Sequence, residues 1–374
     1  MKNVLFTTLA ITVLSAIAFA ETWTVDDDGE ADFNSIQSAI DAASNGDEIF
    51  VGPGTYTSSN EAVLEVAKKG LSISSTEGAE VTIIDGEYQN AGVYCHANGV
   101  LTLDGFTIQK CTNEKGAGID CDSGIITILN CEVKNNTASE RGGAAYCQGN
   151  SVASFSSCIF SNNNANNGGA IGLIDSNVSI DECTFENNTA TSSGGAIRAY
   201  PESSPYVTNS TFTGNNANIG GAVRMMSVGT LCQFTECLFR GNSATTGGAV
   251  ASHNSTSMFS DCTFSENSAS NTGGGLQCTG DDSESYIDNS YFCQNMPQDV
   301  TGCTEESSSN IHLETCPSDC IADLTNDYLV DIADLLILFQ DWGSCDGCES
   351  DLNGDGSVEV NDIITMIGEW GACS

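Results

Sequence analysis

The sequence FSNNNANNGGA at residues 160–170 is followed by FENNTATSSGGA at residues 185–196. Each stretch contains a phenylalanine, an asparagine three residues later and a Gly-Gly-Ala triplet. The same phrase returns along the chain, and its aromatic anchors lie 25 to 28 residues apart between Phe160 and Phe292. A fixed period of this size means that each repeat is one structural unit, which buries its apolar face only against its neighbours. The repeat therefore decides the fold.

The repeats indicate β-structure rather than helix. Apolar residues alternate with polar ones beside the Gly-Gly-Ala triplets, as in Ile119-Asp120-Cys121, and a period of two is the pattern of a strand. Glycine and asparagine clusters interrupt the chain too often for helices longer than a turn or two. We expect an all-β solenoid over residues 21–310, with about three short strands in each coil. An amphipathic segment at 32–43 is predicted to form a helix that caps the open end of the stack.

Stacked coils bring equivalent positions about 4.8 Å apart, so like residues are expected to form columns. The aromatic residues fill the interior, and the glycine pairs supply the positive φ of a tight corner. The asparagine amides are expected to hydrogen bond from coil to coil along Asn136, Asn163, Asn188, Asn215, Asn242, Asn267 and Asn295. Two further columns hold cysteines, namely Cys95, Cys121 and Cys147, and Cys131, Cys158, Cys183, Cys237 and Cys262. Neighbouring cysteines either form disulfides or serve as small buried apolar residues, and the sequence leaves both interpretations open.

The amphipathic segment at 32–43 and the turn and strand that follow it resemble the N-terminal part of right-handed parallel β-helix proteins of the pectin-lyase-like superfamily. The Phe-x-x-Asn and Gly-Gly-Ala phrases are similar to the repeats of chlamydial polymorphic outer-membrane proteins, which have the same fold. The resemblance implies a right-handed parallel β-helix. Those surface proteins also carry a C-terminal membrane barrel that has no counterpart here, so membrane insertion is not expected.

Residues 1–20 are predicted to be a secretory signal peptide, because Lys2 precedes an apolar run that ends at the small-residue site Ala18-Phe19-Ala20. The 18 cysteines fit an oxidising compartment. We therefore expect a secreted protein, extracellular or at the cell surface. The formal net charge of −40 repels nucleic acid and anionic lipid and favours divalent cations.

The last part of the sequence, residues 311–374, contains a duplication with an offset of 28 residues, in which Asp323 and Trp342 return as Asp351 and Trp370. Each copy places oxygen-bearing groups at positions 1, 3, 5, 7, 9 and 12 of a short loop, with the backbone carbonyl used at position 7. This spacing is that of a loop around one Ca²⁺ ion, a hard cation that takes six to eight oxygens, so about two ions are expected. The predicted ligands are Asp323, Thr325, Asp327, Leu329, Asp331 and Asp334 in the first loop, and Asp351, Asn353, Asp355, Ser357, Glu359 and Asp362 in the second.

An apolar helix is predicted after each loop, and the two helices are expected to pair into a small core. Disulfides Cys320–Cys345 and Cys348–Cys373 are expected, since so small a domain needs covalent support. The duplicated loops resemble a dockerin domain, the paired Ca²⁺-binding repeat of bacterial extracellular enzymes. This resemblance implies a cohesin-like docking partner.

The outward-facing column is where chemistry is expected, because the repeated positions are structural. Outward positions beside the Gly-Gly-Ala triplets carry acidic, aromatic and basic side chains that stacking would bring onto one exposed face. Such a mixture suits a carbohydrate-binding surface. The candidate residues are Asp120, Asp122, Tyr146, Arg198, Tyr200 and Arg224.

Two functions remain open at this stage. The first is a Ca²⁺-binding adhesion or scaffold protein that binds polysaccharide or a protein partner, and the uniform repeat favours it. The second is a polysaccharide lyase or glycoside hydrolase of the pectin-lyase type, which the dockerin-like tail favours. The sequence shows no persuasive pair of catalytic acids, so we predict binding rather than catalysis.

Overall fold

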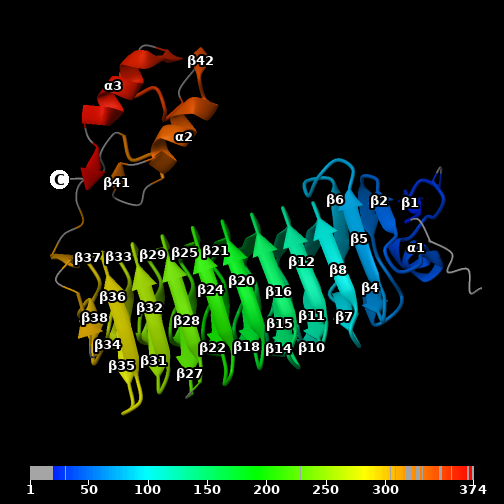
Figure 1. Ribbon diagram of the computed structural model, residues 1–374, viewed down its shortest axis with the longest axis horizontal. Coiled ribbons are helices and arrows are strands. Elements are labelled where there is room, and N and C mark those ends of the chain that lie inside the picture. The colour runs from blue at the N-terminus through cyan, green and yellow to red at the C-terminus, as the bar shows by residue number, and fades with distance from the viewer. Residues whose placement is uncertain are drawn as a thin grey trace, which may run out of the picture.

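Stacked β-coils form an elongated solenoid in the computed structural model, which describes residues 20–29, 31–227 and 229–303 continuously (Figure 1). In the C-terminal part it describes residues 305–307, 309–314, 316, 322–325, 329–330, 332–344, 348–354, 356–368 and 370–372. The predicted signal peptide lies outside the described residues, apart from Ala20. The coils wind as a right-handed parallel β-helix, as expected.

Four parallel sheets run along the stack, and a complete coil passes through sheets A, B, D and C in that order. Sheet A contains β1 (Thr22–Val25), β2 (Glu48–Val51), β5 (Gly70–Ser75), β8 (Val100–Asp104), β12 (Ile125–Leu129), β16 (Val152–Ser156), β20 (Asn177–Asp181), β24 (Ser204–Thr208), β28 (Leu231–Thr235), β32 (Thr256–Ser260), β36 (Glu284–Asp288) and β39 (Glu305–Glu306). Sheet B contains β3 (Gly54–Tyr56), β6 (Thr82–Asp85), β9 (Thr107–Gln109), β13 (Glu132–Lys134), β17 (Ile159–Ser161), β21 (Thr184–Glu186), β25 (Thr211–Thr213), β29 (Leu238–Arg240), β33 (Thr263–Ser265), β37 (Tyr291–Cys293) and β40 (Ile311–Leu313).

Sheet C contains β4 (Ala62–Ala67), β7 (Ala91–His96), β11 (Ile119–Asp122), β15 (Ala145–Gln148), β19 (Ile171–Leu173), β23 (Ile197–Ala199), β27 (Val223–Met226), β31 (Val250–His253), β35 (Leu276–Thr279) and β38 (Val300–Thr301). Sheet D contains β10 (Thr112–Lys115), β14 (Thr137–Arg141), β18 (Asn164–Asn167), β22 (Thr189–Ser193), β26 (Asn216–Ile219), β30 (Ser243–Thr246) and β34 (Ser268–Thr272). Sheet D corrects the expectation of three strands in each coil. The polar segment between the asparagine and the glycines pairs with its equivalents, because stacking satisfies its backbone groups.

Both glycines of each Gly-Gly-Ala triplet are needed where sheet D turns into sheet C. Gly194, the first of its pair, has a φ of +66°, which favours glycine. A Cβ on Gly195, the second, would lie 2.0 Å from the carbonyl oxygen of Gly221 on the next coil. The corner therefore brings the backbones of successive coils closer than any side chain allows.

The interior columns form as predicted. Phe160, Phe185, Phe212, Phe239, Phe264 and Phe292 stack with ring centroids 4.7–4.8 Å apart. In the asparagine column, Asn188 Nδ2 donates to Asn215 Oδ1 over 3.0 Å, and the same oxygen accepts from the backbone of Asn188. These amides are buried, so each one satisfies backbone groups that would otherwise lack partners.

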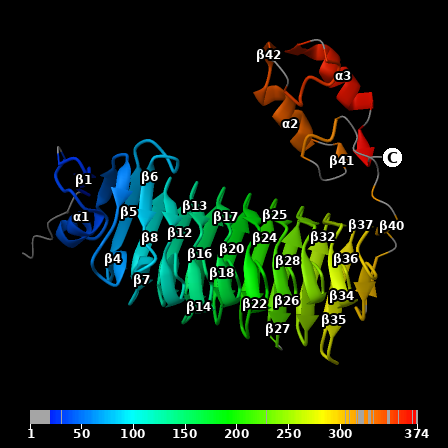
Figure 2. The ribbon, with the colours of Figure 1, turned by 180° about the vertical axis from the view of Figure 1, so that it is seen from behind.

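The N-terminal helix is shorter than predicted. Helix α1 covers Ile36–Ala42 and is capped by the Ser35 side chain, whereas Asp32 instead accepts hydrogen bonds from Thr24. Ile36 and Ile40 join the main core, so α1 covers the N-terminal end of the stack (Figures 1 and 2).

Ten of the described cysteines are buried free thiols, and eight of these form the two predicted columns. Disulfides are found in the last coils instead, as Cys278–Cys303 and Cys293–Cys316. Cys348 is disulfide-bonded, while the predicted partner Cys373 and the predicted pair Cys320–Cys345 lie outside the described residues.

The C-terminal part contains two helices, α2 (Ile332–Gln340) and α3 (Val360–Gly368), which contact each other. Two short antiparallel pairs tie its halves together: β41 (Leu329–Val330) with β44 (Gly371–Ala372), and β42 (Gly343–Ser344) with β43 (Ser357–Val358). Leu338 and Met366 lie in the small core, but one apolar face of each helix stays outside it. The expectation that these faces pair is therefore only partly right, because the core is too small for all of them.

Candidate functional site

The outer face of sheet C carries one in-register column of varied side chains, which we call the outer column. Its members from the N-terminal end are Tyr94, Asp120, Tyr146, Gly172, Arg198 and Arg224. Asp122 lies beside it on β11, and Tyr200 directly follows β23. The register therefore places all six candidate residues on one face, with acidic groups at one end and basic groups at the other.

Most of this face is covered rather than exposed, which corrects the sequence-based expectation. Tyr146 is 1% exposed, and Arg198 and Arg224 are each 8% exposed. The cause is sheet D, which meets sheet C at the glycine corner. The last residues of its strands, including Arg141 and Asn167, flank the outer column. The column thus lines a corner between two sheets and not a flat surface.

Three arginines gather at the basic end without an acidic partner. The guanidinium groups of Arg198 and Arg141 lie 4.3 Å and 5.0 Å from the ring centroid of Tyr200. Arg198 also donates to Asn167 Oδ1 over 3.0 Å, and its Nε is buried without a partner. Within the described residues, no carboxylate lies within ion-pair distance of Arg141, Arg198 or Arg224. Burial lowers the pKa of Arg224 to about 10.

A cavity of about 500 Å³ opens at the acidic end of the outer column. It is lined by Glu61, Glu65, Tyr94, His96, Asn113, Glu114, Lys115, Asp120, Asp122 and Gln148. Burial raises the pKa of Asp120 to about 7, with a smaller contribution from Asp122, and Asp120 Oδ1 has no hydrogen-bond partner. A carboxyl group that holds its proton near neutral pH can donate to a ligand or exchange a proton with it.

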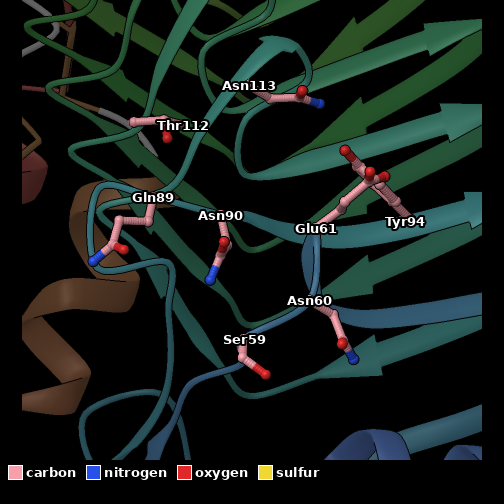
Figure 3. A pocket seen from close by; sticks show the side chains of 8 residues that line it. All are labelled: Ser59, Asn60, Glu61, Gln89, Asn90, Tyr94, Thr112 and Asn113. Atoms are coloured by element: carbon pink, nitrogen blue, oxygen red, sulfur yellow. The ribbon is translucent and has the colours of Figure 1, made fainter.

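A second, polar recess of about 660 Å³ adjoins this cavity and shares Glu61, Tyr94 and Asn113 with it. Figure 3 shows its lining side chains, which come from the segment before β4, the segment before β7, β7 itself and β10. The recess exists because sheet D begins only at β10, so the coils before it lack the strand that flanks the corner elsewhere. We call the two connected hollows the groove.

Sequence reasoning missed several groove residues. Glu61 and Glu65 precede the first recognisable repeat, so the sequence did not place them. The structure pairs Glu65 with Tyr94, which puts Glu65 beside the outer column of sheet C. Asn113 and Lys115 belong to β10, in the sheet that the sequence did not predict. Tyr94 and His96 lie at the outward positions that the alternation of β7 predicts. This alternation could therefore have identified them as groove residues.

The described parts of the two acidic loops share one contact at equivalent positions. Asp334 and Asp362, at position 12 of each loop, are fully buried. Each accepts from the backbone of position 3, at 2.8 Å from Thr325 N and 3.2 Å from Asn353 N. Of the other predicted ligands, Asp327, Asp331 and Asp355 lie outside the described residues. Among the residues that are described, no group of three or more acidic, histidine or cysteine side chains gathers closely enough to hold a metal.

Comparison with known proteins identifies the fold. The family described as "Right handed beta helix region" matches residues 133–292. The fold is a right-handed β-helix. The crystal structure of pectate lyase Pel9A is similar, with a TM-score of 0.50 and 15% identity, over 79% of this chain and 80% of that one. An alginate lyase from Paenibacillus sp. has a TM-score of 0.48 and 14% identity, over 78% and 97% of the two chains.

A pectin methylesterase from carrot has a TM-score of 0.43 and 12% identity, over 78% of this chain and 90% of that chain. At these identities the likeness concerns the fold and not the chemistry. A search of curated protein sequences finds no match. None of the described helices is long and apolar enough to span a membrane.

Proposed function

We propose that this chain is an exported polysaccharide-binding β-helix protein that holds a glycan along the groove and the outer column. The observation that carries the proposal is the unpaired arginine cluster. The chain has 50 acidic residues and four arginines. Three of the arginines, Arg141, Arg198 and Arg224, lie together, and none of the described carboxylates is within ion-pair distance of them. A buried guanidinium without a counter-charge is costly, and a carboxylate or sulfate on a bound glycan would offset that cost.

The rest of the groove fits sugar rings and hydroxyl groups. Tyr94 offers a ring face against which the C–H face of a sugar can pack. Asn60, Asn90 and Asn113 supply amides that donate to and accept from hydroxyl groups. Because the protein as a whole is strongly acidic, an anionic glycan would be attracted only at this corner.

Binding can be tested by titrating neutral and acidic polysaccharides into the mature protein and its Arg198→Ala variant in a calorimeter. We expect Arg198→Ala to weaken binding of an acidic glycan about 10- to 100-fold, as expected for the loss of one charged hydrogen bond. Arg240→Ala is the matched control, since Arg240 lies on sheet B and pairs with Glu266 at 3.4 Å. Equal affinity of both variants and wild type would exclude the arginine cluster as the binding site.

Catalysis on polysaccharide is the second candidate, and the raised pKa of Asp120 favours it. A carboxyl group with a pKa near 7 can act as a general acid or base at neutral pH, as a lyase or a glycoside hydrolase requires. An assay for unsaturated and reducing-end products on a polysaccharide panel tests this role. Turnover that Asp120→Asn abolishes would establish an enzyme in place of a binding protein.

The tail is proposed to bind about two Ca²⁺ ions. The fully buried carboxylates of Asp334 and Asp362 lie in loops rich in other acids, and a hard cation is the partner that such oxygens suit. The ligands would be the twelve residues predicted from the loop spacing. Bound cations would hold each loop against its helix and stabilise the tail.

The tail is also proposed to be a docking module, with a cohesin-like protein as its partner. Each helix exposes a duplicated apolar face whose side chains are 47–67% exposed. These faces consist of Ile332, Leu336, Phe339 and Trp342 on the first copy, and Val360, Ile364, Ile367 and Trp370 on the second. Exposed apolar surface of this kind is typical of a protein-binding site. The disulfides of the last coils support export, because such bonds persist in oxidising compartments.

A further inference from the structure

Cysteines in neighbouring coils lie directly above one another in two buried columns. In sheet C, Cys121 is in register with Cys95 on one side and Cys147 on the other. The second column runs through the turn between sheets A and B. Its cysteines are Cys131, Cys158, Cys183, Cys237 and Cys262, and all of them are buried free thiols.

The sheet C column itself ends in a disulfide. Its register continues from Cys147 through Leu173, Ala199, Met225 and Ser252 to Cys278. Cys278 is bonded to Cys303 on the next coil, with the two Cα atoms 4.8 Å apart. This separation is that of adjacent strands, about 4.8 Å, and falls within the range that a disulfide requires. Cys303 lies one residue past the in-register position, and in-register cysteines on adjacent coils have the same backbone spacing of about 4.8 Å.

The second column also contains a partial hydrogen-bond ladder, in which Cys131, Ser210 and Ser290 accept from the backbone of the preceding coil, while the thiols of the other cysteines donate to backbone carbonyls. Where serine replaces cysteine, Ser210 Oγ accepts from Cys183 N at 3.1 Å and Ser290 Oγ accepts from Cys262 N at 3.2 Å. A hydroxyl serves this purpose better than a thiol, because sulfur is a weak acceptor. The ladder alone would thus favour serine throughout, so the cysteines point to a property that serine lacks.

We propose that Cys95–Cys121, Cys158–Cys183 and Cys237–Cys262 are cross-linking sites that close as disulfides between successive coils of the exported protein. In each reaction two S–H bonds break and one S–S bond forms. Two electrons and two protons pass to a disulfide oxidant, which is reduced to two thiols. The structure then represents the reduced form of these three pairs.

The positions of the sulfur atoms and of the neighbouring cysteines select these pairs over the alternatives. The Sγ atoms of Cys95 and Cys121 lie 2.9 Å and 3.3 Å from the point that a Cβ on Gly124 would occupy, so both sulfurs face the same spot. Cys237 has no cysteine other than Cys262 beside it in its column, and Cys183 lowers the pKa of Cys158. The Cys95 thiol has the same effect on the pKa of Cys121. A thiol with a lowered pKa supplies the thiolate that attacks the oxidant.

The cross-links would act against unravelling of the solenoid. Each repeat contacts only its neighbours, so coils can open one after another from the ends. Each proposed bond joins residues 25 or 26 positions apart and closes one coil. The three bonds and Cys278–Cys303 would be distributed along the stack, so that opening stops at each of them.

Thiol labelling tests the proposal on the full chain, refolded in a glutathione redox buffer and then unfolded in guanidinium without reductant. Mass spectrometry is expected to find an alkylating label on Cys111, Cys131, Cys147 and Cys232, and to find the six proposed cysteines protected. Cys278–Cys303 is the internal control for oxidation. Labelling of all ten thiols in molecules that contain this disulfide would overturn the proposal.

The Cys262→Ser variant adds a specific test, because serines at 210 and 290 leave Cys237 without another partner in its column. We expect Cys237 to become labelled and the oxidised variant to unfold at least threefold faster than the oxidised wild type. Cys232→Ser is the matched control, since Cys232 is buried but in register with Ser257. It should leave Cys237 protected. A Cys237 that stays protected in Cys262→Ser would contradict the assigned pair.

Discussion

The two faces of sheet C differ in how closely they follow the repeat. Side chains on the inner face are small or apolar in every coil, as with Ile171 and Ile197, and they are buried. On the outer face the same strands carry Asp120, Tyr146 and Arg198 at equivalent positions. The inner face is uniform because every coil must fit its neighbours. The outer face contacts sheet D only along its corner, so its side chains can differ from coil to coil, and we propose that these differences serve function.

The largest expected effect is on the uniform inner side. Asn215→Ala would remove the acceptor of Asn188 N and Asn188 Nδ2, and it would remove the side-chain donor to Phe185 O and Asn242 Oδ1. We expect the free energy of unfolding to fall by about 4 kcal/mol, because each buried unsatisfied group costs about 1–3 kcal/mol. Guanidinium denaturation monitored by circular dichroism measures this change.

The neighbouring Asn216→Ala is the control for the asparagine ladder. Asn216 is exposed and its amide contacts only Ser243 on the next coil. We expect a change of less than about 0.5 kcal/mol. If both variants lost the same stability, the asparagine ladder would not be what holds the coils together.

The glycine corner provides the next test. Gly195→Ala would place a Cβ 2.0 Å from Gly221 O, which is backbone and cannot move without separating two coils. We expect a loss of about 3 kcal/mol. Gly241→Ala, at a φ of +61° but with no atom within 4 Å of the added Cβ, should cost only about 1 kcal/mol. The reverse order of the two unfolding free energies would contradict the close approach at the corner.

Loss of Ca²⁺ should destabilise the tail and leave the β-helix intact. Calorimetry on the full chain is expected to find about two bound ions, and Asp362→Asn is expected to reduce the number by one. Asp341→Asn is the control, because its side chain accepts from Ser350 and is not at a ligand position. A wild-type protein that binds no Ca²⁺ would refute the metal proposal.

Protonation of Asp120 gives the smallest effect on stability. The folded protein keeps this proton up to about pH 7, whereas the unfolded chain loses it at about pH 4. The folded state binds more protons in this window, so the free energy of unfolding falls as the pH rises from about 4 to 7, by up to about 2 kcal/mol. Asp120→Asn should remove this part of the slope. An unchanged slope would mean that Asp120 is ionised throughout.

Much of the fold could be predicted, because its determinants are repeated in the sequence. The aromatic, asparagine and glycine positions predicted the core, the ladder and the corner. Sheet D was missed because its strands, such as Asn164–Asn167, are short and polar apart from one small buried residue, Ala165, and so show no clear alternation. Because sheet D was not predicted, neither the burial of Arg198 nor the recess before β10 could be predicted. The tail helices were predicted from their apolar periodicity. That periodicity does not give the size of the core, and the size of the core decides how much of each apolar face stays exposed.

The most direct test of the account measures glycan affinity and the free energy of unfolding on the same Arg198→Ala protein. We predict at least a tenfold loss of affinity for an acidic polysaccharide with a change in stability of less than about 1 kcal/mol, since this arginine has no ion pair to lose. Unchanged affinity together with a large loss of stability would show that the outer column, like the inner one, is only structural.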